Sequence, residues 1–128
     1  MSAITTLALL VPDYAAGIAF YVQGLGFDLL EDIDQGHKRW VRVAPPGGHG
    51  VALLLARAED DRQRAAIGDQ AGGRVFLFLE TDDFDGDAAR LTSAGAVFEE
   101  APRDEPYGRV AVWRDPFGNR WDLLQRKR

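Results

Sequence analysis

The sequence contains no cysteine, and this absence limits the chemistry open to the chain. Its 128 residues can form no disulfide, no thiolate metal site and no thiol nucleophile. Histidine is scarce as well, since His37 and His49 are the only two, and both fall in turn-rich segments. They lack the spacing of a ligand pair on one helix or strand. We therefore expect both histidines to be solvated rather than to bind a metal ion.

The sequence also has no apolar run near the roughly 18 residues that a membrane-spanning helix needs. Its start, Met1-Ser2-Ala3, lacks the basic and apolar regions of a secretory signal. We expect a cytoplasmic protein with no membrane partner. A basic stripe is missing too, and the net charge of −5 argues against a nucleic-acid partner. With 46% hydrophobic residues, the chain can bury the core of one ordinary domain.

A turn near the end of the chain is the clearest local signal that is present. Asp115 suits the first position of a type I turn, Pro116 pre-sets φ at the second, and Gly118 accepts a left-handed backbone. Runs rich in β-branched and aromatic residues flank this turn, so the sequence predicts a hairpin over residues 107–125. Alternation along its second strand places Asp122 on one face and Trp121 on the other.

The hydrophobic pattern of the chain occurs twice. A strand over 4–11, a helix capped by Asp13 and ended by Gly24 and Gly26, and strands over 27–33, 38–44 and 50–56 form the first set. After a charged linker, the set returns about 70 residues later: a strand over 74–80, a helix capped by Asp82 or Asp83 and ended by Gly95, and strands over 97–99, 109–114 and 120–125.

This repetition predicts the fold class. We expect an α+β protein of two tandem βαβββ repeats, about 3–57 and 73–126, joined by a linker of about 58–72. Neither repeat buries much surface alone. The two repeats should therefore form a single domain, 1–128, with one continuous curved, cleft-forming mixed sheet and helices outside.

The motifs at the two ends of the chain resemble those of a known family. The opening Val11-Pro12-Asp13-Tyr14, the helix end Leu25-Gly26-Phe27 and the closing Asp115-Pro116-Phe117-Gly118-Asn119 are similar to the vicinal oxygen chelate superfamily. That superfamily includes glyoxalase I, bleomycin-resistance proteins and extradiol dioxygenases. The resemblance extends from Thr5 to Gln125 and implies a small-molecule cleft and a homodimer.

In its metal-using members, the superfamily places ligands on the first and last strand of each repeat. Carried onto this sequence, the four positions are Thr6, approximately Leu53, Phe76 and Asp122. Only Asp122 is a competent ligand, whereas a catalytic metal needs about three protein ligands. We therefore expect no metal centre and no cofactor.

The other candidate residues have two interpretations each. Asp122 either pairs with a nearby arginine or lies in an apolar cleft, where burial would make it a base or an orienting acceptor. The rings could line the cleft or belong to the core, and the arginines could hold a carboxylate or phosphate or be solvated. The acidic segment around Pro102 is expected to be a solvated loop. The candidates for the ligand-binding cleft are Thr6, Trp40, Arg42, Leu53, Phe76, Tyr107, Arg109 and Trp113.

Three functions are open at this point. The first is a binding protein of the bleomycin-resistance kind, which holds a small apolar or aromatic molecule without the usual metal. The alternative is an enzyme, either a metal-dependent lyase, isomerase or extradiol-type dioxygenase with an altered site, or one that uses Asp122 as a base without metal. The third is a component of a larger assembly whose cleft has lost its function.

Overall fold

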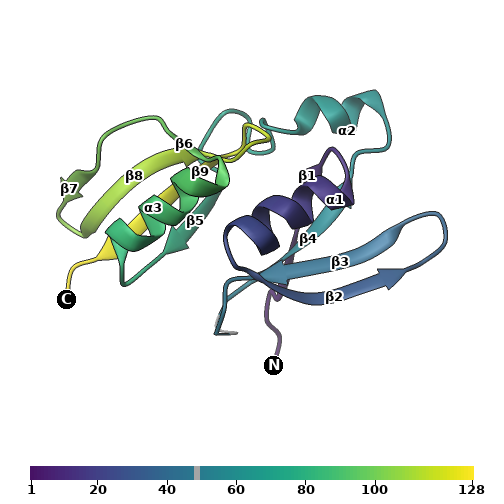
Figure 1. Cartoon of the computed structure of the whole chain (residues 1–128), viewed down its shortest axis with the longest axis horizontal. Helices are drawn as coiled ribbons and strands as arrows, with labels where there is room; N and C mark the ends of the chain where they lie inside the picture. Colours follow the sequence, from purple (N-terminus) through teal and green to yellow (C-terminus); the bar gives the residue numbers. More distant parts are fainter. Residues whose placement is uncertain (48–49) are drawn as a thin grey trace. The chain divides into compact units, whose positions relative to one another are not determined.

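The computed structural model describes residues 1–47 and 50–128, which form two compact units (Figure 1). We call Met1–Ile67 the first module and Gly68–Arg128 the second module. Each is a βαβββ-like arrangement with its own mixed sheet, so the predicted α+β fold class is confirmed. The expected single continuous sheet is corrected, because the strands of the described residues hydrogen-bond as two sheets. That the modules form a single domain stays a prediction.

The first module contains a four-stranded sheet in the order β1-β4-β3-β2. Strand β1 pairs with β4 in parallel, and the other neighbours are antiparallel. The short helix α2 lies in the segment expected to be a linker. The elements are β1 (Thr6–Val11), α1 (Tyr14–Ile18), η1 (Ala19–Gly24), β2 (Asp28–Asp34), β3 (Arg39–Ala44), β4 (Ala52–Arg57) and α2 (Asp61–Ala66).

The helix of the first module begins where the sequence predicts and then changes its winding. Asp13 caps it by accepting a hydrogen bond from the Ala16 N–H at 2.7 Å. The predicted single α-helix is corrected, because η1 is a π-helix that directly follows α1. Helix α1 lies close to β4 because Gly17 has no side chain: a Cβ there would lie 2.9 Å from Leu55 Cδ1.

The second module contains a five-stranded sheet in the order β5-β9-β8-β6, with β7 also paired to β8. Asp83 caps its helix, and Gly95 ends it at a φ of 106°. The segment expected to be a solvated loop around Pro102 contains the short strand β7, which is a correction. The elements are β5 (Leu77–Glu80), α3 (Phe84–Ala94), β6 (Val97–Phe98), β7 (Arg103–Glu105), β8 (Gly108–Arg114) and β9 (Arg120–Arg126).

The predicted turn between β8 and β9 is confirmed. The Gly118 N–H donates to the Asp115 carbonyl at 3.0 Å, and Gly118 has a φ of 87°. The buried Asp115 carboxylate accepts from the Asn119 N–H and from the Trp121 indole, at 3.0 and 3.2 Å. The side-chain oxygen of Asn119, Oδ1, in turn accepts from the Gly68 N–H at 2.9 Å. The turn is thus fastened to the first residue of the module.

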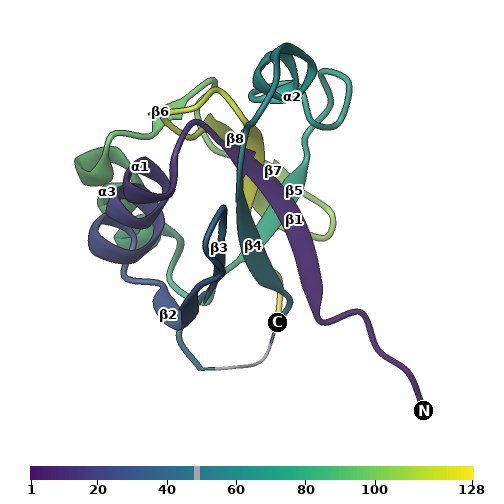
Figure 2. The ribbon, with the colours of Figure 1, turned by 90° about the vertical axis from the view of Figure 1, so that its right-hand side faces the viewer.

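Each sheet has a face covered by the helix of its own module and an opposite face, which we call the open face. Figure 2 shows α1 on one side of the sheet of the first module. Leu55 lies against α1, so Leu54, its neighbour in β4, points to the open face. In the second module, Arg109 contacts Phe84 of α3, so its neighbours in β8 point to the open face. Residues of the other strands that pair in register with these residues point to the same face as their partners.

Candidate functional site

The open face of the first module brings together several of the predicted site residues. Arg42 Nη1 lies 2.5 Å from Glu31 Oε1, and Arg42 Nε donates to Thr6 Oγ1 at 3.2 Å. The Trp40 indole also donates to Glu31, and the bonds from Arg42 and then Trp40 lower the pKa of Glu31. We call Thr6, Glu31, Trp40 and Arg42 the Arg42 cluster. Three of its four members were predicted from the sequence.

The surroundings of the Arg42 cluster are aliphatic. Leu54 is the register partner of Arg42 on β4, and Ala8 is the partner of Leu54 on β1. Neither of these neighbours is charged, and the guanidinium of Arg42 forms its ion pair with Glu31. The predicted use of Arg42 as an anion ligand would have to displace Glu31.

The two modules also identify the true counterpart of Asp122. Phe78 pairs with Asp122 in the second module as Ala8 pairs with Leu54 in the first, both in parallel strand pairs. The match of Asp122 to Leu53 is therefore wrong by one residue. Leu53 is buried and points to the same face as Leu55, toward α1.

Asp122 occupies an unusual position on the open face of the second module. Its Oδ1 atom is buried and has no hydrogen-bond partner among the described residues, although the side chain as a whole is only partly buried. Burial raises the pKa of Asp122, and Glu100 adds to this, whereas Arg103 and Arg120 act in the opposite direction. Within residues 1–47 and 50–128, no arginine or lysine forms a salt bridge with Asp122, so the ion-paired interpretation is not supported.

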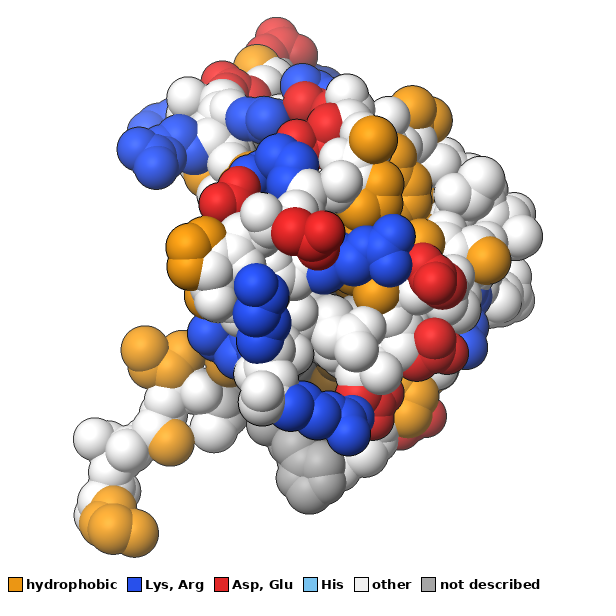
Figure 3. Space-filling model, turned by 90° about the vertical axis from the view of Figure 1, so that its left-hand side faces the viewer, with side chains coloured by type: hydrophobic (Ala, Val, Ile, Leu, Met, Phe, Trp, Pro, Cys, Tyr) orange, Lys and Arg blue, Asp and Glu red, His pale blue; other side chains and the backbone are white. Residues whose placement is uncertain are grey.

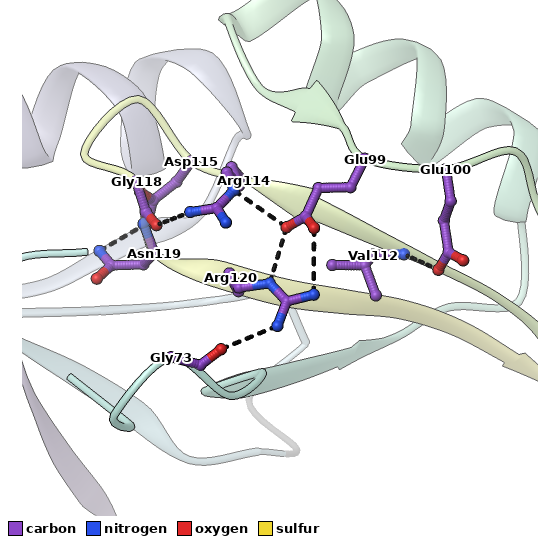
Figure 4. Close-up of polar contacts among 9 residues, drawn as sticks. All are labelled: Gly73, Glu99, Glu100, Val112, Arg114, Asp115, Gly118, Asn119 and Arg120. Atoms are coloured by element: carbon purple, nitrogen blue, oxygen red, sulfur yellow. Dashed lines mark hydrogen bonds and ion pairs between the residues drawn. The ribbon is translucent and has the colours of Figure 1, made fainter. Parts of the chain in front are cut away.

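The second module also has a set of paired charges, which Figure 4 shows. Arg120 bonds Glu99 through two nitrogens at 2.8 and 3.1 Å, and Arg114 adds a third contact at 3.1 Å. These bonds, from Arg120 first, hold the pKa of Glu99 below its usual value. Arg120 also donates to the Gly73 carbonyl at 2.9 Å. We call Glu99, Arg114 and Arg120 the Glu99 ion-pair cluster.

Glu100 has a different role. Its carboxylate accepts the Val112 N–H at 2.8 Å and a bond from Arg103 Nε at 2.8 Å. Burial acts to raise the pKa of Glu100, but these two bonds outweigh it and lower the pKa below 4.5. The interpretation of this acidic segment as merely solvated is therefore corrected.

Several predicted cleft residues lie elsewhere. Trp113 is fully buried and stacks on Trp121 with 4.9 Å between ring centroids, on the face of β8 that points to α3. Arg109 lies over the Phe84 ring and 3.2 Å from Asp85, so it too is on the helix side. Both assignments to a cleft wall are wrong, because the alternation of a strand does not reveal which face its helix covers.

Two further predicted residues lie at edges of the second module. Tyr107 is 51% exposed in the turn between β7 and β8. Phe76 precedes β5, and its N–H donates to the Arg120 carbonyl at 2.8 Å. The sequence reasoning missed Phe78, which is 64% exposed next to Asp122 in register. The signal for it in the sequence was the alternation of Leu77 and Leu79, which are half-buried, with Phe78 and Glu80, since this places Phe78 on the same face as a charged residue.

The residues present do not fit the metal centre that the family implies. Of the four positions carried over from the family, Leu53 and Phe76 have no donor atom, Thr6 has only a hydroxyl that already accepts from Arg42, and Asp122 alone is a competent ligand. The register partners Ala8, Leu54 and Phe78 add no donor atom. Within residues 1–47 and 50–128, no group of three His, Asp or Glu side chains could hold an ion. His37 is exposed as predicted, whereas His49 lies outside the described residues.

Acidic and basic side chains are interspersed on the face drawn in Figure 3, without a continuous basic stripe. In the described part of the chain, none of the helices has the length and apolar character to cross a membrane.

The fold and its open faces define a glyoxalase-like α+β protein of two βαβββ-like modules. The chain belongs to the Glyoxalase/Bleomycin resistance protein/Dioxygenase superfamily, whose family model matches residues 3–123. This membership confirms the resemblance to the vicinal oxygen chelate superfamily.

Similar proteins cover nearly the whole chain. An uncharacterized protein of Shewanella frigidimarina is 55% identical over 124 residues, which are 95% of this chain and 92% of that protein. TnmS3, an antibiotic-binding protein from Streptomyces sp. CB03234, is 35% identical with a TM-score of 0.78, over 99% of this chain and 98% of its own. UcmS2 is 26% identical with a TM-score of 0.83, over 97% of this chain and 98% of its own.

Proposed function

We propose that this protein binds a small apolar or aromatic molecule without a metal centre, as bleomycin-resistance-type proteins do. The observation that carries the proposal is its 35% identity with the antibiotic-binding protein TnmS3 across both chains. The donor chemistry supports it as well. Of the four positions where metal-using relatives place ligands, Leu53 and Phe76 have no donor atom and Thr6 has only a hydroxyl, so the ordinary metal chemistry of the family has no basis in these residues.

The open face of the first module has the composition of a small-molecule surface. Trp40 supplies a large ring whose indole N–H is already engaged by Glu31, which fixes the ring beside Arg42. Leu54 and Ala8 provide aliphatic surface next to it. Apolar walls with a few fixed polar groups are the usual composition of such sites. Trp40 and Leu54 thus provide one surface on which an apolar part of the ligand can lie.

Calorimetric titration with a panel of polycyclic aromatic antibiotics tests the proposal. We expect at least one compound to bind saturably and be recovered unchanged, and Trp40→Ala to weaken it by about tenfold or more through lost apolar contact. Val51→Ala, which removes an exposed apolar side chain just before β4, is the control and should leave the affinity unchanged. Full affinity in Trp40→Ala, or no binding by any compound, would contradict the proposal.

An enzyme is the second candidate function, and the raised pKa of Asp122 favours it. A carboxyl group whose pKa is raised by burial is suited to accept a proton at neutral pH. The distinguishing result is the fate of the bound compound. Conversion that Asp122→Asn abolishes, with binding retained, would establish catalysis, whereas unchanged recovery favours binding alone. Metal analysis of protein purified without chelators, with a Mn, Fe, Ni, Zn and Co stability screen, tests the altered metal site.

We also propose that the protein is a cytoplasmic homodimer. Twofold dimers are the commonest symmetric assemblies of soluble proteins. The edge strand β2 supplies apolar surface for such an interface through the exposed Leu29, Leu30 and Ile33. Light scattering at several concentrations should give twice the 14.1 kDa mass of the chain. A monomer at every concentration would refute the dimer.

A further inference from the structure

Asp122 is the one carboxylate of its surroundings that the protein itself leaves incompletely satisfied. Its Oδ1 is buried, and none of the described residues donates to it. A buried carboxylate oxygen without a donor is unfavourable, because it has lost water and gained no hydrogen bond in exchange. An acid in this state is therefore stabilised by any donor that reaches the same carboxyl group.

The nearby arginines are already engaged with other acids. Arg120 bonds Glu99 twice and the Gly73 carbonyl once. Arg103 bonds Glu100 at 2.8 Å and Glu105 at 2.6 Å. Both arginines are near enough to act on Asp122 electrostatically, but they donate the hydrogen bonds described above to other acceptors. The protein has cations beside Asp122 and directs their donors to different carboxylates.

Apolar side chains flank Asp122 on the two neighbouring strands. Phe78 is its register partner on β5 and is 64% exposed, and Val112 is its register partner on β8. Register partners point to the same face of a sheet, so an exposed ring and an aliphatic group stand on either side of the carboxyl group. This arrangement can contact an aromatic ring and a polar substituent at the same time.

We propose that Asp122 and Phe78 select ligands in which an aromatic system carries a hydrogen-bond donor, either an amino group or a hydroxyl group. The inference rests on the proposed binding function and deepens it by naming the ligand class. The donor group bonds the Asp122 carboxylate, and the aromatic system lies against Phe78. Asp122 is thereby a specificity residue: it distinguishes ligands with a donor from ligands without one, and Phe78 contributes to the affinity for both.

Three probes with one ring system test this selection: naphthylmethylamine, naphthylmethanol and methylnaphthalene. They carry an ammonium group, a hydroxyl group and neither. We expect the wild-type protein to prefer the amine to methylnaphthalene by about tenfold to a hundredfold, which is the usual size of a charge-assisted hydrogen bond. Titration followed by NMR at neutral pH measures all three affinities on the intact chain.

The variants separate selection from binding. Asp122→Leu should abolish the preference for the amine without weakening methylnaphthalene, and the nearly isosteric Asp122→Asn should reduce it with the fold intact. Phe78→Ala should weaken all three probes alike. Asp104→Asn, the same change at an exposed acid of β7, is the matched control and should change none of the affinities.

The outcomes distinguish this inference from the function on which it rests. Equal affinity of the wild-type protein for the three probes overturns the role of Asp122 but leaves aromatic binding standing. The same holds for a preference that survives in both Asp122 variants. If none of the probes binds, the proposed function and the selection by Asp122 both fail.

Discussion

The two modules have the same order of elements but are stabilised in different ways. Among the described residues, the buried side chains of the first module are apolar, whereas the second module buries Asp115 and Asn119. In the first module, Gly17 lets the helix lie directly against Leu55. In the second, a hydrogen-bonded turn fastens Gly68 to β9. One scaffold thus accepts either close apolar packing or a buried polar network as its source of specificity.

The open faces differ in the same sense. The pair formed by Arg42 and Leu54 in the first module corresponds to Val112 and Asp122 in the second. The charge is paired in the first module, where Arg42 contacts Glu31. In the second module, Asp122 Oδ1 accepts no hydrogen bond from the described residues, although ion pairs lie nearby. This contrast supports the proposal that the second face presents a polar group for recognition, whereas the first face has an ion pair beside its apolar surface.

The largest effect is expected from removing the polar network of the second module. Asn119→Ala leaves the Gly68 N–H and the Asp115 carboxylate without their bonds of 2.9 and 3.0 Å. We expect a loss of about 3 kcal/mol in the free energy of unfolding, because the Asp115 carboxylate is buried and the Gly68 N–H is half-buried. Urea unfolding measures it, with the exposed Gln23→Ala as control. A loss as small as that of the control would remove the distinction between the modules.

A second variant makes the open faces more alike. Leu54→Asp places an acid at the counterpart of Asp122, where it loses apolar contact and must be desolvated beside Arg42. We expect a loss of about 2 kcal/mol, reduced from a full burial penalty because Leu54 is partly exposed. Thermal unfolding compares it with Leu29→Asp at an exposed position of β2. An equal stability of both variants would mean that the first face accepts an acid as readily as the second.

A smaller loss is expected at Glu100. Glu100→Gln weakens the bond to the Val112 N–H and should cost about 1 kcal/mol at neutral pH. Because the folded-state pKa of Glu100 is lowered, its stabilisation is present above the ordinary value of 4.5 and is lost as the pH falls. Unfolding at neutral and acidic pH, with the exposed Glu59→Gln as control, tests both points. A difference from wild type that grows toward low pH would contradict the assignment.

The smallest effect has the opposite sign. Burial raises the folded-state pKa of Asp122, so its ionised form is less stable in the folded than in the unfolded chain. Stability is therefore lost as the pH rises from 3.8 through the folded pKa, and Asp122→Asn should gain less than about 1 kcal/mol at neutral pH, since the side chain is partly solvated. Thermal unfolding should show the gain vanish below pH 3.8. A destabilised Asp122→Asn at neutral pH would contradict this sign.

Local signals in the sequence predicted most of the fold. Asp13, Asp83 and Gly95 delimit helices because their chemistry satisfies or terminates the helix ends. Strand β7 was missed because its residues, Arg103, Asp104 and Glu105, have no apolar alternation. It pairs with β8 through backbone bonds that no side-chain pattern announces. The π-helical winding of η1 was missed for a similar reason.

The candidate site was less predictable than the fold. Trp40, Arg42 and Asp122 were predicted as site residues, and in the structure they lie on the open faces of the modules. Leu54 was missed because the repeat spacing is 70 residues at Ala8 and Phe78 but 68 at Leu54 and Asp122, and a shift of one residue reverses the face. Trp113 and Arg109 were misplaced because sequence alternation defines two faces without saying which one a helix covers.

The bond between Glu100 and Val112 has a consequence for how this family can change. Four residues, 99–102, stand opposite two, 111 and 112, between the pairs Phe98–Trp113 and Arg103–Val110. The Glu100 carboxylate accepts the Val112 N–H of β8 in place of a peptide carbonyl, so this N–H stays hydrogen-bonded where the two extra residues interrupt the strand pairing. The backbone between Glu100 and Arg103 therefore does not have to keep the residue spacing of the paired strands. Insertions and loop grafts there should be tolerated, which makes it a natural point for divergence and for engineering.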